Sequence, residues 1–218
     1  MPLELVGGLF LAMLVNNQIR GVRVFRTIFY LPTVLAGVAF AVVWLWMLNP
    51  RGGLVNLILA QVGIVGPRWL LDPDWALSAL LMMSFWGWGR AMIIYLAGLQ
   101  AIPGELYESA AIDGANAWAK FRYVTLPMLS PTIFFNLILS VIGTFQTFTN
   151  AFVATNGGPL DATLFFVLYL YKQAFELLNM GYASALAWVL FLVILVLTLL
   201  IFRTQRFWVF YAGEKVDE

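Results

Sequence analysis

Polar and small residues recur at helical spacing within one apolar stretch of this 218-residue chain. The positions are Asn136, Ser140, Gly143, Thr147 and Asn150. Their intervals of four, three, four and three residues would place all of them on one face of a continuous helix. Side-chain amides and hydroxyls suit the hydroxyl groups of a sugar, which indicates a solute pathway. Such residues also mediate ordinary helix packing in membranes, and the spacing supports both interpretations equally.

One cation, Arg90, lies inside a second apolar stretch, beside Trp86 and Trp88. A charge within a bilayer is costly and usually marks a functional position. Arg90 is therefore a candidate for solute contact or for the wall of a water-filled cavity. The structural alternative is a guanidinium that snorkels to the interface or binds backbone carbonyls between helices. We expect no carboxylate within the spans, which disfavours an ion-coupled carrier.

The chain contains no cysteine and no histidine. Their absence excludes disulfides, thiolate metal sites and most nucleophile–base pairs, so we expect no catalytic residue and no bound metal. Neither GxxxxGKS nor GxxxxGKT occurs, and the chain is not expected to bind ATP or another cofactor itself. A formal net charge of +1 gives no indication of nucleic-acid binding.

Composition places these residues in a membrane. Hydrophobic residues make up 62% of the chain and charged residues 11%, against about 45–50% and about 25% in soluble domains. A membrane-crossing helix needs roughly 20 apolar residues. Four stretches qualify and a fifth is short: residues 28–48, 75–99, 128–151, 182–202 and, as the short one, 3–15. We expect an all-α, polytopic helical bundle with about five transmembrane helices, forming one domain over residues 1–218.

Lysine and arginine indicate which ends of the spans face the cytoplasm, because positive charge is retained there. Eight of the 12 cations fall on one side: Arg20, Arg23, Arg26, Lys120, Arg122, Arg203, Arg206 and Lys215. Residues 104–127 and the C-terminus are therefore expected in the cytoplasm. Residues 54–64 and 162–178 are apolar but short, and we expect them to form short helices outside.

The first apolar stretch begins almost at residue 1, with no basic residue ahead of it. It also lacks the three-part pattern of a secretory signal. We expect that at least one preceding span is missing from this sequence. A five-span protein with an unusual start is the alternative.

The cytoplasmic segment 104–127 differs in composition from its apolar flanks. Its central charged residues are Glu108, Asp113, Lys120 and Arg122, set among many alanines. Pro103 suits the first turn of a helix and Gly114 favours its end, and a second helix is predicted to start at Leu126-Pro127. Small side chains would let another protein close tightly around the helix, with acidic side chains as hydrogen-bond acceptors at the edges. A solvated, alanine-rich loop is the alternative.

The spacing in this segment resembles the EAA loop in the permease subunits of bacterial binding-protein-dependent ABC importers. That motif reads E-A-A, three residues, G, nine residues, I, one residue, L-P. The matching positions are Glu108, Ser109, Ala110, Gly114, Val124, Leu126 and Pro127. Ser109 and Val124 depart from the motif, but each is similar in size to the residue that the motif has at that position. The chain is also similar to the carbohydrate-uptake branch of these permeases, of maltose F-type or glycerol-phosphate A-type. The similar residues are 26–32, 96–103, 156–159, 174–175 and 181–185.

The resemblance implies a non-catalytic permease subunit in a bacterial or archaeal cytoplasmic (inner) membrane. Its expected partners are a second permease subunit, forming a heterodimer, two ATPase subunits, an extracytoplasmic solute-binding protein and membrane lipid. The helix around residues 108–119, including Asp113, would be a coupling helix docked on an ATPase subunit. The expected solute is a sugar or related polyhydroxy compound. The alternatives are glycerol phosphate or another non-sugar solute, an ion-coupled secondary transporter, and a membrane enzyme or scaffold.

Overall fold

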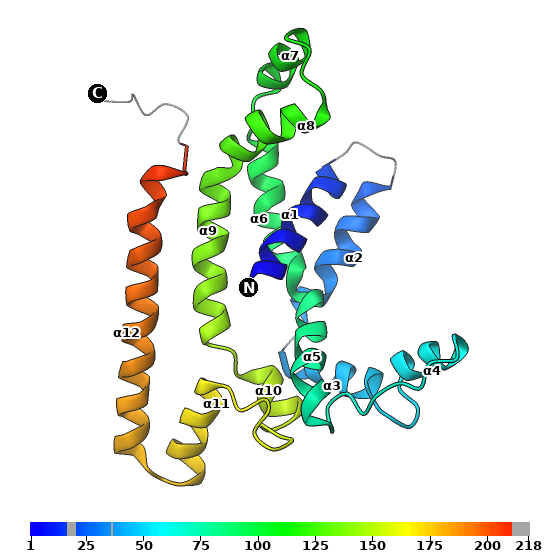
Figure 1. The fold of residues 1–218 in the computed structure, drawn as a ribbon, viewed down its shortest axis with the longest axis vertical. Coiled ribbons are helices and arrows are strands. Elements are labelled where there is room, and N and C mark those ends of the chain that lie inside the picture. Colours follow the sequence, from blue (N-terminus) through cyan, green and yellow to red (C-terminus); the bar gives the residue numbers. More distant parts are fainter. Residues whose placement is uncertain (17–20, 36, 211–218) are drawn as a thin grey trace. The chain divides into compact units, whose positions relative to one another are not determined.

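The computed structural model describes residues 1–16, 21–35 and 37–210, which form helices and turns with no β-strand among them (Figure 1). The helices are α1 (Pro2–Asn16), α2 (Val22–Val34), α3 (Gly37–Met47), α4 (Leu54–Gln61), α5 (Pro73–Ser84), α6 (Trp88–Gln100), α7 (Gly104–Ile112), α8 (Ala117–Lys120), α9 (Leu126–Phe145), α10 (Thr149–Ala154), α11 (Phe166–Tyr171) and α12 (Met180–Thr204). Two 3₁₀ turns, at Phe85–Gly87 and Gln205–Phe207, and two π-helical turns, at Phe121–Thr125 and Lys172–Glu176, adjoin them. The predicted all-α fold is confirmed. Arg20 and Lys215, two of the cations used for orientation, lie outside the described residues.

Three helical segments are long and apolar enough to cross a membrane. They are Pro73–Gln100, Ala117–Ala154 and Met180–Phe207. Each contains one of the predicted spans. α1 is apolar but has only 15 residues, as expected for the first stretch.

The predicted span over residues 28–48 is not one continuous helix. α2 ends at Val34 and α3 begins at Gly37, so the pair forms a further span only if it is counted as a bent one. Pro32 lies inside α2. It has no N–H to donate to the carbonyl of Ile28, and its ring crowds the preceding turn, which weakens the helix here.

The chain folds into two compact units, each built from separate stretches of sequence. Unit 1 comprises Met1–Tyr30, Trp88–Val141 and Leu195–Glu218. Unit 2 comprises Leu31–Gly87 and Ile142–Ile194.

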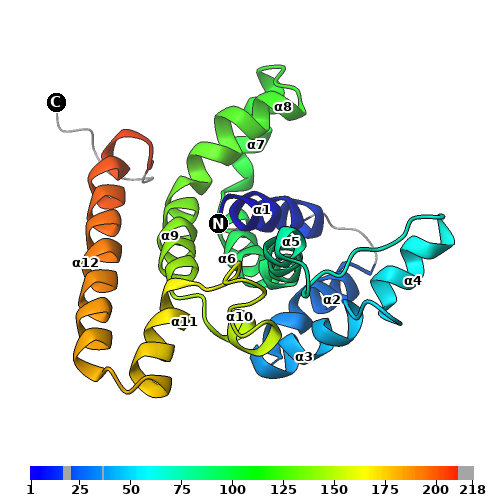
Figure 2. The same cartoon turned by 60° about the horizontal axis from the view of Figure 1, so that its bottom comes forward.

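In unit 1, α1 lies directly against α6 (Figures 1 and 2). Gly7 and Gly8 are buried in this contact. A Cβ added to Gly8 would lie 2.7 Å from the Cβ of Ala91, and one added to Gly7 would overlap the ring of Trp88. Small residues thus let the two backbones approach closely, as is usual between membrane helices.

In unit 2, α3 lies against α10 and aromatic rings fill much of the core. The rings of Trp44 and Trp86 meet edge to face, with centroids 5.2 Å apart. Phe148 and Phe152 stack at 5.1 Å, and Tyr171 lies 5.2 Å from each of them. These are favourable geometries for aromatic pairs.

Candidate functional site

The segment between α6 and α9 contains an exposed helix, α7. α7 and α8 project beyond the ends of α6 and α9 within unit 1 (Figure 1). Pro103 occupies the position immediately before α7, with φ −59° and ψ 132°, and not its first turn as predicted. Pro103 lacks an N–H to bond into a helix, and its extended ψ sets it outside α7.

Gly114 ends α7, as predicted. Its φ of +78° is left-handed, a conformation that glycine adopts without steric cost. The N–H of Gly114 bonds to the carbonyl of Ala111 at 3.1 Å, and the N–H of Ala115 bonds to that of Ala110 at 2.9 Å. These two bonds form a Schellman motif, which satisfies carbonyls at the end of the helix.

The predicted coupling residues divide into an exposed group and a shielded group. Glu108, Ser109, Asp113 and Gly114 are exposed, whereas Ala110, Leu126 and Pro127 are partly buried. α7 has no buried residue at all. The exposed residues therefore form the surface that a partner could contact. Leu126 and Pro127 lie at the start of α9 and are not part of that surface.

Large apolar side chains on this segment are also exposed. Ile112 is 87% exposed, Tyr123 76% and Trp118 69%. Exposed apolar side chains gathered in one region are typical of contact surfaces. These three residues were not among the predicted coupling residues, although large apolar side chains within a comparatively polar segment were a signal that could have identified them.

The chain becomes helical again at Ala117, nine residues before the predicted restart at Leu126. Asn116 starts this helix, because its side chain accepts a 2.8 Å hydrogen bond from the N–H of Ala119. α8 then continues through the π-helical turn Phe121–Thr125 into α9. Asn116 is thus a capping residue that the prediction overlooked.

Prolines at the start of α9 account for its irregular hydrogen bonds. The ring of Pro127 would crowd the carbonyl four residues earlier, and the wider π-helical turn accommodates it. Pro131 cannot donate to the carbonyl of Pro127, and the hydroxyl of Ser130 donates to that carbonyl at 2.6 Å. Ser130 also accepts a 2.8 Å bond from the N–H of Phe210, which ties the chain after α12 to α9.

The predicted polar face is interrupted. α9 ends at Phe145, Thr147 lies in the break before α10, and Asn150 lies on α10. The hydroxyl of Thr147 donates to the carbonyl of Thr144 at 2.9 Å, a side-chain bond that competes with helical continuation. The prediction that all five residues share one helix face is therefore wrong beyond Gly143.

Asn136 and Ser140 are buried on α9, at 4% and 6% exposure. The amide of Asn136 donates to the carbonyl of Thr132 at 3.2 Å. The hydroxyl of Ser140 donates to the carboxylate of Glu4 at 3.0 Å. Glu4 lies in the first turn of α1, so the expectation that the predicted spans contain no carboxylate is wrong for the short first stretch, residues 3–15.

Arg90 lies in the first turn of α6 and its side chain is exposed. Within the described part of the chain it makes no hydrogen bond or ion pair. The residues described also contain no cluster of three or more metal-ligating side chains.

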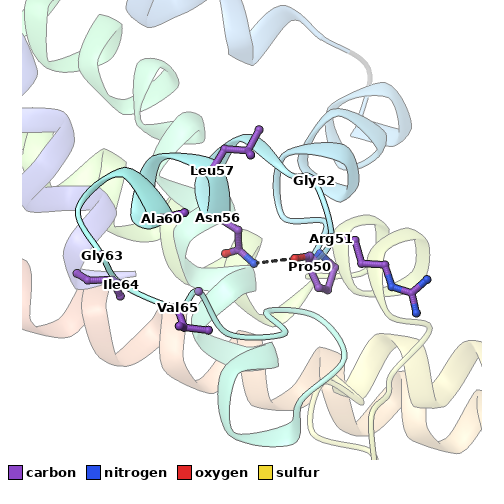
Figure 3. Close-up of a pocket in the computed structure, with 10 residues that line it drawn as sticks. Pro50, Arg51, Gly52, Asn56, Leu57, Ala60, Gly63, Ile64 and Val65 are labelled. Carbon is purple, nitrogen blue, oxygen red and sulfur yellow. Dashed lines mark hydrogen bonds between the residues drawn. The ribbon is translucent and has the colours of Figure 1, made fainter.

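A pocket of about 420 Å³ lies in unit 2, between the turn after α3 and the loop after α4 (Figure 3). Asn56 at its centre donates to the carbonyls of Pro50 and Pro67, at 3.3 and 3.2 Å. Its amide oxygen accepts a 2.7 Å bond from the indole N–H of Trp69. Because both donors and the oxygen of Asn56 are engaged by the protein, this amide holds the loop together and is not free to bind a solute.

A second ordered loop of unit 2 follows α10. Thr163 is fully buried, bonding to the hydroxyl of Thr155 at 2.6 Å and donating to the carbonyl of Gly158 at 2.8 Å. The ammonium of Lys172 donates to the carbonyl of Asn156 at 2.8 Å. Leu160 at the tip of this loop is 90% exposed.

Several apolar spans, with an exposed helical segment between α6 and α9, define a polytopic membrane protein. The chain belongs to the family described as "Binding-protein-dependent transport system inner membrane component", which matches residues 4–208. This membership confirms the predicted permease class and its place in a membrane, and it excludes the ion-coupled alternative.

Similar proteins and a similar solved structure agree with membership of this permease family. The chain is 43% identical to the probable ABC transporter permease protein YesP of Bacillus subtilis, over 98% of this chain and 70% of that protein. It is 38% identical to the lactose transport system permease protein LacF of Rhizobium radiobacter, over 94% and 71% of the two chains. The fold is similar to a chain of the bacterial alginate ABC transporter, solved in complex with an alginate pentasaccharide-bound periplasmic protein. The TM-score is 0.85 at 26% identity, covering 93% of this chain and 72% of that one.

Proposed function

We propose that this chain is a permease subunit of an ATP-driven importer that carries a sugar or related polyhydroxy solute across the cytoplasmic membrane. The observation that carries the proposal is α7, an exposed helix closed by Gly114 at the end of two packed spans. The names of LacF and of the alginate transporter support a carbohydrate as the solute. Glycerol phosphate or another non-sugar solute is the alternative.

The proposed complex contains a second permease subunit, two ATPase subunits and an extracytoplasmic solute-binding protein. The periplasmic protein present in the alginate transporter complex supports the last of these partners. ATP would be bound and hydrolysed by the ATPase subunits, and this chain would carry no catalytic residue. Segment 104–127 and the C-terminus would face the cytoplasm, in agreement with the distribution of lysine and arginine.

In this arrangement α7 is the contact through which ATPase movement reaches the membrane helices. The surface formed by Glu108, Ser109, Asp113 and Gly114 would dock on an ATPase subunit. When the ATPase subunits close around ATP, α7 moves with them and the spans exchange one packed arrangement for another. Alternating access then depends on the stiffness of the connection between α7 and α9.

Not all of the polar positions are equally suited to a solute. Asn136 and Ser140 are buried and engaged within the protein, which favours the packing role for them. Thr147 and Asn150 are partly buried and Gly143 is exposed, so a solute could reach them. Arg90 is exposed and would suit an acidic or phosphorylated solute.

The proposal is tested by uptake in cells that lack this gene and carry it on a plasmid. We expect complementation to restore accumulation of a labelled sugar, identified from a panel that includes glycerol phosphate. Gly114→Val forces a β-branched residue into a left-handed conformation, at a cost of roughly 1–2 kcal/mol, and should abolish uptake at normal membrane levels. Gly104→Ala is the matched control, since its added Cβ meets nothing within 4 Å. Normal uptake by Gly114→Val would contradict the proposed role of α7.

A further inference from the structure

A chain of hydrogen bonds ties α7 to the start of α9. The hydroxyl oxygens of Tyr107 and Thr125 are 3.0 Å apart. Thr125 donates to the carbonyl of Lys120 at 3.4 Å. A threonine hydroxyl has one proton, so Thr125 accepts from Tyr107 while it donates to Lys120. The phenol of α7 is thereby connected, through Thr125 in the π-helical turn, to the carbonyl of Lys120 at the end of α8.

Tyr107 is also the residue through which α7 contacts the core of unit 1. It is partly buried and packs against the apolar cluster that includes Leu99, Ile102 and Leu129. Thr125 is 7% exposed. The bond between the two hydroxyls is therefore partly shielded from water, and a hydrogen bond is electrostatically stronger in such surroundings than in solution.

On the side of α9, the bond between Tyr107 and Thr125 ends in a π-helical turn. Thr125 is the last residue of the π-helical turn Phe121–Thr125, and α9 follows without interruption. Single π-helical turns within α-helices are rare and are often found at functional sites. A displacement of α7 would thus act on the turn that sets the direction of α9.

We infer that Tyr107 and Thr125 are positioning residues that transmit movement of α7 to α9. This inference rests on the proposed function of α7. Docking uses the exposed residues of α7, whereas the Tyr107–Thr125 link joins α7 to its own chain. Removing the link leaves ATPase binding intact, and each ATP hydrolysed then imports less solute.

The test is the number of ATP molecules hydrolysed per solute imported, measured on the whole complex in proteoliposomes. Tyr107→Phe keeps the ring in the core and Thr125→Val keeps the shape of the side chain, and each removes the bond. We expect each to raise the ratio about three- to tenfold, the range expected for one lost hydrogen bond. The double variant should be no worse than either single one. Thr125→Ser should behave as wild type because it keeps the hydroxyl.

Thr204→Val is the matched control for Thr125→Val, since Thr204 is exposed on α12 and its hydroxyl donates to the carbonyl of Ile201 in its own helix at 2.9 Å. It should leave the ratio unchanged. Unchanged ratios in both Tyr107→Phe and Thr125→Val, or additive effects in the double variant, would overturn the inference and leave the proposed function standing. Loss of ATPase co-purification with Tyr107→Phe would also overturn it, because the link would then serve assembly. A wild-type complex without ATP-dependent import would instead refute the proposed function.

Discussion

The hydroxyl of Ser140 donates a 3.0 Å hydrogen bond to the carboxylate of Glu4, two residues 136 positions apart in the sequence. The bond joins α9 to α1 within unit 1. No cation within the described residues pairs with Glu4, so Ser140 is the polar partner that the structure provides for this carboxylate. A carboxylate among membrane spans needs such a partner.

Glu4→Ala and Ser140→Ala should each destabilise the protein, and their effects should not add. In a double-mutant cycle we expect a coupling free energy of about 0.6 kcal/mol, and no more than about 1.7 kcal/mol. The measurement is the free energy of unfolding in mixed detergent micelles. Glu105→Ala on the exposed surface of α7 serves as the control and should change the free energy of unfolding by less than about 0.5 kcal/mol. Strictly additive effects of the two alanine variants would show that the bond contributes nothing.

Alanine at two helical glycines should change stability in opposite directions. A Cβ at Gly8 would lie 2.7 Å from that of Ala91, whereas a Cβ at Gly143 meets nothing within 4 Å. Gly8→Ala is expected to lower the free energy of unfolding by about 1–3 kcal/mol through overpacking. Gly143→Ala is expected to raise it by about 0.4–1 kcal/mol through reduced freedom of the unfolded chain. The measurement is the midpoint of thermal unfolding of each variant in detergent. Equal shifts of this midpoint in the two variants would argue against the close packing of α1 on α6.

Asn56→Ala should loosen the loop that follows α4. It removes two donated bonds and one accepted bond, each lost bond costing about 0.5–1.5 kcal/mol. Trypsin is expected to cleave faster after Arg51 and Arg68, which flank the segment that Asn56 holds. Gln61→Ala, an exposed position on the same helix, is the control and should leave both cleavage rates as in wild type. If the rates do not change in Asn56→Ala, the amide does not hold this loop.

Composition and the length of apolar stretches were sufficient to predict three of the spans, because burial in lipid constrains every residue of a spanning helix. The glycine at the end of α7 was predictable for a local reason, since few other residues adopt its conformation. Both features depend on residues that are near one another in sequence.

The features that could not be predicted depend on distant contacts or on interrupted helices. Nothing local to Ser140 indicates that Glu4 is its partner. The three–four spacing of the polar residues assumed one continuous helix, and the break after Phe145 removes Thr147 and Asn150 from it. The π-helical turn before α9 likewise follows from how prolines are accommodated in a packed helix.

The central claim is that α7 docks on an ATPase subunit, and a single photo-crosslink tests it most directly. The chain has no cysteine, so Ser109→Cys supplies a unique thiol on the exposed surface of α7 for a benzophenone maleimide. Leu160→Cys, 90% exposed on the loop after α10, is the matched site expected to face the other side of the membrane. Irradiation of the assembled complex should join an ATPase subunit to the probe at residue 109 and not to the probe at residue 160. Capture of the ATPase from residue 160, or its absence from residue 109 in an active complex, would contradict the account.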